Sequence, residues 1–492
     1  KMGNVTLKVD NLIHQKRDFL PGESQVEALH SIEKIESPIS GLDENIQRLQ
    51  GYLAKIKESK SHISFEAHEQ AVSRHVYAIG QAALSEALSH YDVTSKVISV
   101  GEQTYRYSHR STKEYQTAFG GIKVARNMYN NRKSDGDGHC ICPLELQSGV
   151  IEGYWTPLAA KHAMWSLSHL TPQETEDMML HFGMMNPSRS SLDRIPKALN
   201  QHWEDKVIEH HETIIEDEVI PVDATSVATS LDGVMIGMKP EQPAENKATQ
   251  WREASCGTIS FFNKEGERLS TIQYGRAPEH KKETLKTLLL KNTETILQQR
   301  PELKLVHLAD GAQDNWTFFD EQMPLGFQLT DFYHACEYLK SAFDAAYPND
   351  KSKAMSQFEA YKIKLRDDEN GVQKTLRALR YLRSQHKTNK DIAASVTYFT
   401  NNQHRMKYAQ AKQQQFPIGS GIVEAACKTL VGQRLKRAGM SWTTNGGQAI
   451  LTFRSLIKSQ RFDKAWEIVA KQYRKNVTEH NKLAKLVVNN LN

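Results

Sequence analysis

The sequence predicts an α/β protein built around one mixed β-sheet, with a large all-α insertion and mainly α-helical regions before the sheet. Three segments with strand-type alternation come first, at 227–239, 252–262 and 268–275. A helical pattern at 281–299 and a fourth strand pattern at 303–310 follow. Three strands, a helix and a further strand are the opening order of an RNase H-like sheet.

Length and composition are those of a globular chain with several domains. The 492 residues exceed what one hydrophobic core holds, so about two to four domains are expected. Hydrophobic residues make up 39% and charged residues 25%, and no apolar run approaches the roughly 18 to 20 residues that span a bilayer. The first twenty residues lack the features of a signal peptide, and the five cysteines are mostly far apart. We therefore expect a cytoplasmic protein without a disulfide framework.

The chain is expected to divide into five parts. In chain order these are a helical amino-terminal region and oligomerisation candidate at 1–100, a hairpin plus helix-turn-helix-like DNA-binding region at 101–200, the first part of the sheet at 201–332, the helical insertion at 333–415, and the final helices with a basic tail at 416–492. The hairpin is predicted over 103–130, with its turn at a Gly-Gly pair.

Three short helices are predicted between the hairpin and the sheet. The second begins at Thr171, and Glu174 three residues later completes a capping-box signature. Together with a tight turn at Gly183, the three resemble a helix-turn-helix module. The last helix would present Arg189 and Arg194 to a DNA groove. A plain three-helix packing unit is the alternative.

Three acidic residues form a candidate catalytic site. Asp232 lies in the first strand, Asp310 ends the fourth, and Glu424 stands near the start of a late helix. Carboxylates on adjacent strands of such a sheet can converge. Three of them could hold two Mg²⁺ ions about 4 Å apart, with Mn²⁺ as a substitute, and such a pair of ions acts on a phosphodiester bond. Each acid also has an ordinary interpretation, because Asp-Gly is a common turn and an acid near a helix start favours the dipole. Asp223 is a rival first acid.

The segment after Glu424 is almost entirely cationic. It carries Lys428, Arg434, Lys436 and Arg437. Charge of one sign suggests a polyanionic partner, so these side chains are predicted to clamp the phosphate backbone of DNA. Trp442 in the same stretch, or Trp316 after the second acid, could stack on an unpaired base, and burial in the core is the alternative for both.

A loop before the first predicted helix of the triplet contains His139, Cys140 and Cys142. These are zinc-ligand types, but a zinc site needs four ligands in paired spacings and no partner pair lies nearby. Two small buried cysteines are the simpler interpretation.

Five motifs carry a resemblance to a known family. They are "TSLDGVMIGMK", "WREASCGTISFF", "LADGAQDNW", "DFYHACEYL" and "PIGSGIVEAACKTLVGQRLKRAGMSW". They resemble the transposases of ISKra-type bacterial insertion sequences, in the Mutator-like group of DDE transposases. The likeness runs from about 218 to 470 and is weaker over 103–200.

The resemblance implies an RNase H-like catalytic domain with a helical insertion between the second and third acids. By motif, the catalytic and metal-binding residues would be Asp232, Asp310 and Glu424. Asp331 and His334 in "DFYH" match a group pattern near the site and would support it without binding the metal themselves. The chain departs from the family at Val431, where many relatives place Lys or Arg.

The implied function is a DNA transposase that binds the terminal inverted repeats of its element. Mg²⁺-dependent cleavage and strand transfer would follow, performed by a homodimer or higher oligomer on double-stranded DNA in the bacterial cytoplasm, associated with the nucleoid. Two alternatives stay open. One is an RNase H-like nuclease or resolvase that cuts without joining, and the other is a DNA-binding derivative without catalysis.

Overall fold

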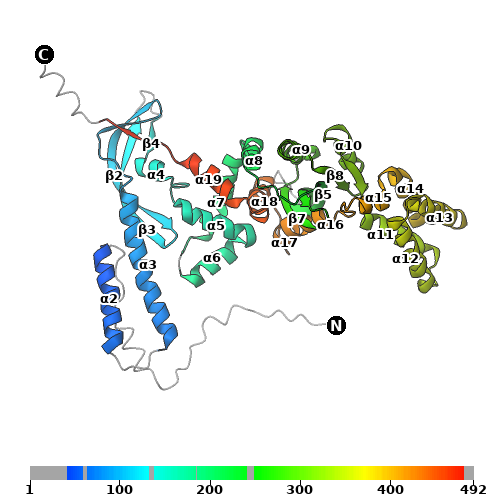
Figure 1. Ribbon diagram of the computed structural model, residues 1–492. Coiled ribbons are helices and arrows are strands. Elements are labelled where there is room, and N and C mark those ends of the chain that lie inside the picture. Colours follow the sequence, from blue (N-terminus) through cyan, green and yellow to red (C-terminus); the bar gives the residue numbers. More distant parts are fainter. Residues whose placement is uncertain (1–40, 59–63, 132–137, 184, 241–248, 481–492) are drawn as a thin grey trace, which may run out of the picture. The chain divides into compact units, whose positions relative to one another are not determined.

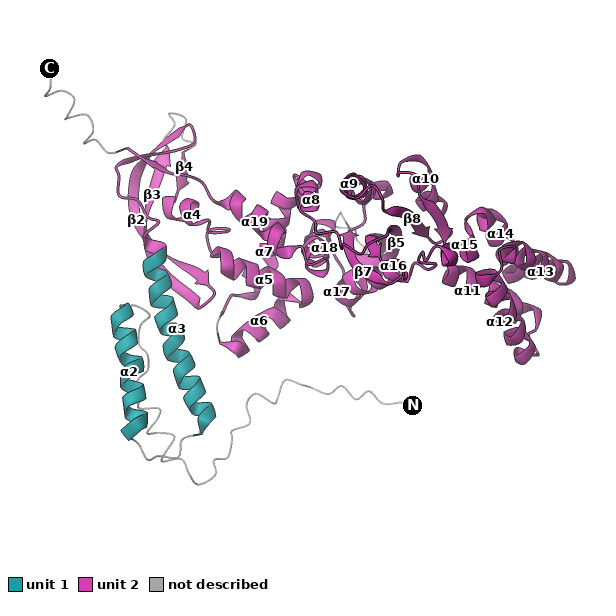
Figure 2. Cartoon of the chain, in the orientation of Figure 1, with its two compact units in different colours: residues 1–87 teal, residues 88–492 magenta. Residues whose placement is uncertain are grey.

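The computed structural model describes residues 41–58, 64–131, 138–183, 185–240 and 249–480. The chain forms two compact units, residues 1–87 and 88–492 (Figure 2). Predictions for the first forty residues and for the end of the basic tail lie outside the described ranges. In these ranges every helix is too short or too polar to span a bilayer.

The described residues of the amino-terminal unit are helical. It contains α2 (Leu42–Glu58) and most of α3 (Phe65–Ser89) (Figure 1). Asn45 of α2 is buried, and its side-chain amide donates to the carbonyl oxygen of Ala78 in α3 at 3.5 Å. The two helices therefore contact each other through a polar group.

The first sheet has the strand order β10-β1-β2-β3-β4. Its strands are β1 (Val97–Val100), β2 (Gln103–Thr117), β3 (Gly120–Asn131), β4 (His139–Ile141) and β10 (Thr478–Glu479). The predicted hairpin is β2–β3 and is confirmed. The Gly-Gly pair is not the turn, because Gly120 and Gly121 already pair with β2 and the connection is the two residues before them. Nothing in the sequence pattern indicates β10.

Five helices follow the first sheet. They are α4 (Pro143–Ser148), α5 (Pro157–His169), α6 (Pro172–Phe182), α7 (Arg189–Glu204) and α8 (Val207–Glu216). The predicted capping box of α6 is present, since Thr171 and Glu174 bond reciprocally across the first turn. Gly183 ends α6 with φ of 72°, a backbone conformation that glycine adopts without strain.

The second sheet has the order β7-β6-β5-β8-β9. Its strands are β5 (Ser226–Met238), β6 (Gln250–Phe262), β7 (Arg268–Arg276), β8 (Lys304–Ala309) and β9 (Phe327–Thr330). Adjacent strands among β7, β6 and β5 are antiparallel, whereas β8 and β9 are parallel to β5. The connections contain η2 (His280–Lys282), α9 (Glu283–Gln299) and α10 (Gln313–Glu321). The four predicted strands and the predicted helix are confirmed, and β9 is a strand that the patterns do not indicate.

The predicted insertion is all-helical, as expected. It consists of α11 (Phe332–Ala346), α12 (Lys351–Asp367), α13 (Gly371–Gln385), α14 (Lys390–Asn402), η3 (Gln403–Arg405) and α15 (Tyr408–Gln413). These helices have a core of their own that includes Leu339, Phe343, Leu376, Leu379 and Phe399. The core also takes in residues of β8 and β9, so the insertion packs directly on the edge of the sheet.

The carboxyl-terminal segment starts with α16 (Gly421–Ala426), so Glu424 does lie near the start of a late helix, as predicted. The segment continues through a π-helical turn (Cys427–Gly432) into α17 (Gln433–Leu435), and α18 (Thr444–Lys458) and α19 (Phe462–Tyr473) follow.

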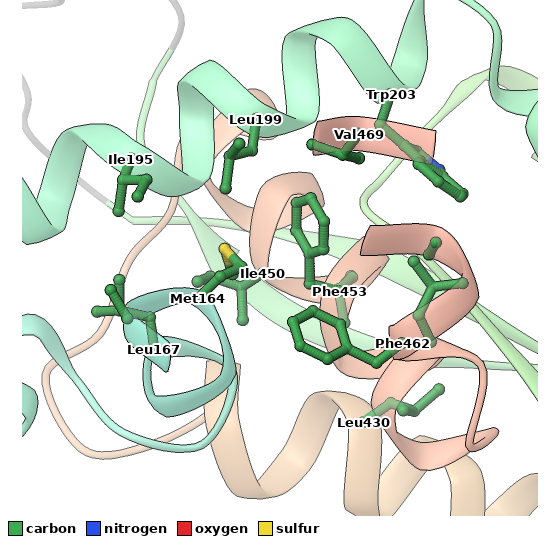
Figure 3. Close-up of a cluster of buried hydrophobic side chains, with 14 of the residues drawn as sticks. Met164, Leu167, Ile195, Leu199, Trp203, Leu430, Ile450, Phe453, Phe462 and Val469 are labelled. Atoms are coloured by element: carbon green, nitrogen blue, oxygen red, sulfur yellow. The ribbon is translucent and has the colours of Figure 1, made fainter. Parts of the chain in front are cut away.

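One hydrophobic core joins the helices α5–α7 to the second sheet and the carboxyl-terminal helices. Figure 3 shows part of it, where Met164 of α5, Leu199 of α7 and Phe453 of α18 lie together. The same cluster contains Ile236 of β5 and Leu430 of the π-helical turn. The boundary expected at residue 200 therefore falls inside α7 and inside a shared core.

His307 lies buried in the middle of β8. Its Nε2 is 2.9 Å from the carbonyl oxygen of Pro324, and its Nδ1 is 2.7 Å from the Thr229 hydroxyl. Because a carbonyl can only accept, Nε2 carries the proton and Nδ1 accepts from Thr229. Burial lowers the pKa of His307 to about 4.

We expect His307 to make the fold sensitive to acid. Its folded pKa lies below the unfolded value, so the unfolded chain binds more protons and stability is lost as pH falls from about 6.5 towards 4, by up to about 3 kcal/mol. Melting temperatures measured between pH 7.5 and 4.5 should fall less steeply for His307→Gln than for wild type. His109→Gln, at an exposed position, is the control and should keep the wild-type slope. Equal slopes for all three proteins would contradict this assignment.

Candidate functional site

Three aspartates lie at one edge of the second sheet, where its parallel strands end. The β5–β8 pairing ends at Ser230 and Leu308, and Asp232 and Asp310 each lie two residues further. The β8–β9 pairing ends at Thr330, and the Asp331 backbone N–H donates to the Ala309 carbonyl at 2.8 Å. Carboxyl ends of parallel strands meet at one edge, so the sheet topology brings the three side chains together.

Asp232 is not part of a turn. Asp232 pairs with Cys256 and Gly233 with Ser255 inside the β5–β6 ladder, so this Asp-Gly lies within a strand. The turn interpretation of this dipeptide is wrong. By contrast Asp310-Gly311 does follow the end of β8.

Asp331 connects the sheet edge to α11 and α16. It is fully buried and caps α11, because its Oδ1 accepts the backbone N–H of Tyr333 at 2.6 Å and of His334 at 3.3 Å. Its Oδ2 accepts the backbone N–H of Ser420 at 3.1 Å and also the Ser420 hydroxyl. All four interactions come from donors, so this carboxylate ties the first turn of α11 to the residue that precedes α16.

Glu424 reaches the same group of carboxylates from α16. The Ser420 hydroxyl lies 3.0 Å from Glu424 Oε1 and also contacts Asp331, so one serine bridges the two acids. α16 packs against β5 and β6, the strands around Asp232. Glu424 therefore lies near Asp331 and Asp232, and Asp232 lies near Asp310.

The pKa values of two of these acids reflect their surroundings. Burial raises the pKa of Asp232, and the nearby Asp310 carboxylate raises it further. Burial likewise raises the pKa of Glu424, with added contributions from the negative charges of Asp331 and Asp232. These shifts arise because like charges share a partly desolvated space, a situation that a bound cation relieves.

Two further groups adjoin Asp232. The charge of Lys282, which precedes α9, lowers the pKa of the Asp232 carboxyl, as does a hydrogen bond from the Cys427 thiol. Lys282 also forms an ion pair with Glu253 at 3.0 Å. A hydrogen bond with Cys256, followed by burial, raises the pKa of Cys427, which is therefore a neutral thiol that donates to Asp232.

Tyr398 of α14 is a residue that sequence reasoning did not find. Burial raises the pKa of its phenol, as do the charges of Asp331 and Asp310. Its hydroxyl is buried and has no hydrogen-bond partner among the described residues. Gly311 makes room for it, since a Cβ there would lie 2.5 Å from the Tyr398 ring. A tyrosine in a helix 88 positions after Asp310 carries no local signal, so only the fold reveals it.

His334 lies beside Tyr398 but does not touch the Asp331 carboxylate with its ring. The ring centroids of His334 and Tyr398 are 5.7 Å apart, and Tyr338 stacks on Tyr398 at 4.0 Å. The Nδ1 atom of His334 is 3.3 Å from Glu337. The contacts of Asp331 with α11 are those of a helix cap.

The donor chemistry of the site fits Mg²⁺, although the side chains as placed do not enclose an ion. Within the described ranges no three His, Cys, Asp or Glu side chains stand together as a metal site. Glu424 Oε1 is turned towards Ser420 instead. Carboxylate oxygens are nevertheless the ligands that Mg²⁺ prefers, and the unpartnered Tyr398 hydroxyl adds another oxygen near the group.

The predicted DNA clamps after Glu424 divide into exposed and buried cations. Lys428 and Lys436 are exposed, and Lys436 lies over the Trp251 ring at 5.9 Å. Arg437 is also exposed but forms an ion pair with Glu174 of α6.

For Arg434 the prediction of a phosphate contact is wrong. Only 1% of Arg434 is exposed, and its Nε donates to the Leu167 carbonyl at 3.1 Å. Burial lowers the pKa of Arg434 to about 10, and the charge of Arg454 contributes. This guanidinium holds α5 against α17 instead.

The two tryptophans proposed for base stacking are also structural. Trp442 packs against the shared core, and its Nε1 donates to the Leu435 carbonyl at 2.9 Å. Trp316 is 1% exposed, and Arg405 lies over its ring at 4.4 Å. The core alternative therefore holds for both, and the stacking prediction is wrong.

The arginines of the helix-turn-helix-like region lie on the first turns of α7. Ser188 caps this helix, and Arg189 and Arg194 are exposed. The Arg194 Nε donates to the Ser190 carbonyl at 3.2 Å, which leaves most of the guanidinium accessible. Their role in DNA binding stays a prediction.

The three candidate zinc ligands before α4 do not form a metal site. His139 and Cys140 are exposed on β4, and Cys142 is buried at the start of α4. Burial raises the pKa of the Cys142 thiol. In the residues that the structure describes, no further ligand joins them.

No family model and no curated protein matches the chain. Among solved structures, the chain is similar to the Drosophila P element transposase strand transfer complex with a TM-score of 0.24 and 10% sequence identity, over 68% of this chain and 86% of that chain. A TM-score this low does not show a shared fold.

Proposed function

We propose that the chain is a DDE-type DNA transposase that binds the terminal inverted repeats of its element and catalyses Mg²⁺-dependent strand cleavage and strand transfer. The placement of Asp232 and Asp310 at one edge of the second sheet, with Glu424 in a helix that packs against β5 and β6, supports this proposal. The enzyme acts on double-stranded DNA as a dimer or higher oligomer.

The strand order supports an RNase H-like assignment for the second sheet. Three antiparallel strands are followed by two strands parallel to the central β5, and helices connect β7 to β8 and β8 to β9. The helical insertion begins directly after β9 and ends before α16, between the second and third acids of the triad. This is the arrangement that the family resemblance implies.

The chain's own residues have distinct tasks in the proposed reaction. Asp232, Asp310 and Glu424 would hold Mg²⁺, which when bound supplies the Lewis acidity that activates a hydroxyl and stabilises charge at the phosphate. Asp331 positions Glu424 through Ser420. The Tyr398 phenol is a neutral donor beside the carboxylates, suited to a phosphate oxygen.

A nick-and-join assay tests the function. The full-length protein is incubated with MgCl₂, a supercoiled plasmid, and a linear fragment carrying the DNA that flanks its own gene. Strand cleavage with a new 3′-hydroxyl, followed by joining to the plasmid, is the expected result. Cleavage without joining would instead identify a nuclease. Binding without cleavage would identify a catalytically idle derivative. A protein that neither cleaves nor binds this DNA would overturn the proposal.

End recognition is expected to depend on α7. The double variant Arg189→Ala/Arg194→Ala in the full-length protein should bind the flanking DNA about 10-fold more weakly, with a smaller salt dependence, because two exposed cations that face a phosphate backbone are lost. Fluorescence anisotropy at several NaCl concentrations measures both quantities. Lys197→Ala, later in the same helix and paired with Asp193, is the control and should bind as wild type. Wild-type affinity for the double variant would remove α7 from the DNA interface.

A further inference from the structure

The helical insertion contains a concentration of positive charge that the site above does not use. Residues 351–390 include eleven Lys or Arg and four Asp or Glu, a net charge of +7, whereas the whole chain has a net charge of +5. The rest of the chain is therefore slightly acidic in sum. A local excess of this size indicates a polyanionic partner more directly than the bulk charge does.

Helix α13 lies at the centre of this charged segment and has no acidic residue. Its buried residues, which include Leu376, Leu379 and Leu382, face the core of the insertion. The side turned to solvent carries Arg377, Arg380 and Tyr381, and Tyr381 is 65% exposed. We call these three residues the α13 face.

Most acids of the segment are already neutralised by neighbouring cations. Asp368 pairs with Lys374, and Asp367 pairs with Arg366 and Lys412. The guanidinium groups of Arg377 and Arg380, by contrast, have no hydrogen bond or ion pair within the described ranges. The positive charge of the α13 face is therefore unbalanced by the protein itself.

Resting on the proposed function, we propose that the α13 face binds the sugar-phosphate backbone of the duplex DNA that occupies the carboxylate site. Residues 377 to 381 extend about 6 Å along the helix axis, which matches about two base-pair steps of 3.4 Å. Arginine and tyrosine side chains are common phosphate donors. Because α13 packs on α14, the helix that brings Tyr398 to the acids, the face and the site belong to one packed body.

Equilibrium binding of a 30-base-pair duplex of random sequence tests this surface. The full-length Arg377→Ala/Arg380→Ala protein should bind about 10-fold more weakly than wild type near 100 mM NaCl, and the slope of log K against log salt should fall by about 2, because two phosphate contacts are lost. The Arg377→Lys/Arg380→Lys protein should keep most of the wild-type affinity for the duplex. Lys55→Ala/Lys57→Ala, which removes two exposed cations from α2, is the matched control and should bind as wild type.

Unchanged affinity and slope in the Arg377→Ala/Arg380→Ala protein would overturn the inference. The inference would also be overturned if the Arg377→Ala/Arg380→Ala protein lost binding to anionic phospholipid vesicles but lost no binding to DNA. That result would assign the face to a membrane surface. Wild-type protein that binds duplex through this face but neither cuts nor joins would refute the proposed function and leave the α13 face standing. If the wild-type protein cuts and joins DNA and the Arg377→Ala/Arg380→Ala protein binds DNA normally, only the inference about the α13 face is refuted.

Discussion

Glu424→Gln is expected to lower strand cleavage by roughly 1,000-fold or more while DNA binding persists. The glutamine has the same shape, and its amide can still form a hydrogen bond with the Ser420 hydroxyl, so α16 should keep its place. What is lost is one negative charge beside Asp232, the charge that a divalent cation needs. Single-turnover cleavage of the flanking-DNA fragment, measured across MgCl₂ concentrations, reports the loss and any drop in apparent Mg²⁺ affinity.

Asp223→Asn is the matched control for this experiment. Asp223 is exposed and precedes β5, whereas Asp232 lies six residues into that strand, about 20 Å further along it. Cleavage by Asp223→Asn should equal that of wild type. If Asp223→Asn abolishes cleavage and Glu424→Gln does not, the triad Asp232, Asp310 and Glu424 is wrong.

Asp331→Asn is expected to reduce both stability and cleavage. The carboxylate accepts from donors on both oxygens, towards α11 on one side and Ser420 on the other. An asparagine supplies one oxygen only, so its NH₂ group must face an N–H donor, at a cost of about 3 kcal/mol in a buried site. Ser420 then loses its anchor, and Glu424 with it, so cleavage should fall by about 100-fold.

Melting curves and cleavage rates of Asp331→Asn, Ser420→Ala and the double variant separate the two effects. Ser420→Ala alone should lower cleavage about 10-fold with a small change in melting temperature, since it removes the bridge but keeps the α11 cap. If Asp331 acts through Ser420, the two losses of cleavage should not add in the double variant. Fully additive losses, or normal cleavage by Asp331→Asn, would contradict the positioning role.

The sequence predicts the strands of the second sheet well because their signal is local. β5, β6 and β7 are nine residues or longer and alternate or run apolar over their length. The four residues of β9 are too few to form such a pattern, and β9 is nevertheless the strand that delivers Asp331. The placement of Asp232 and Asp310 at one edge follows from the pairing of β5 with β8, which is why it could be anticipated from their positions in the strands.

The cationic stretch shows where local reasoning ends. Arg434 and Lys436 are two residues apart and equally charged, yet one is buried and the other exposed. The difference depends on the Leu167 carbonyl, 267 residues earlier in the chain, which receives the Arg434 N–H. No spacing rule within the segment contains that information, and the same holds for Trp442 and for Tyr398.

The pairing of β10 with β1 also bears on the order in which the protein takes shape during translation. Ser95 donates to the carboxylate of Glu479, a residue 384 positions later, and Ile98 pairs with the same residue. A ribosome adding about 5 to 20 residues per second needs tens of seconds to bridge that interval. Over this period the outer side of β1 is an unpaired strand edge, which favours contacts with other nascent chains. The first sheet is thus completed only after all strands of the second sheet have been synthesised.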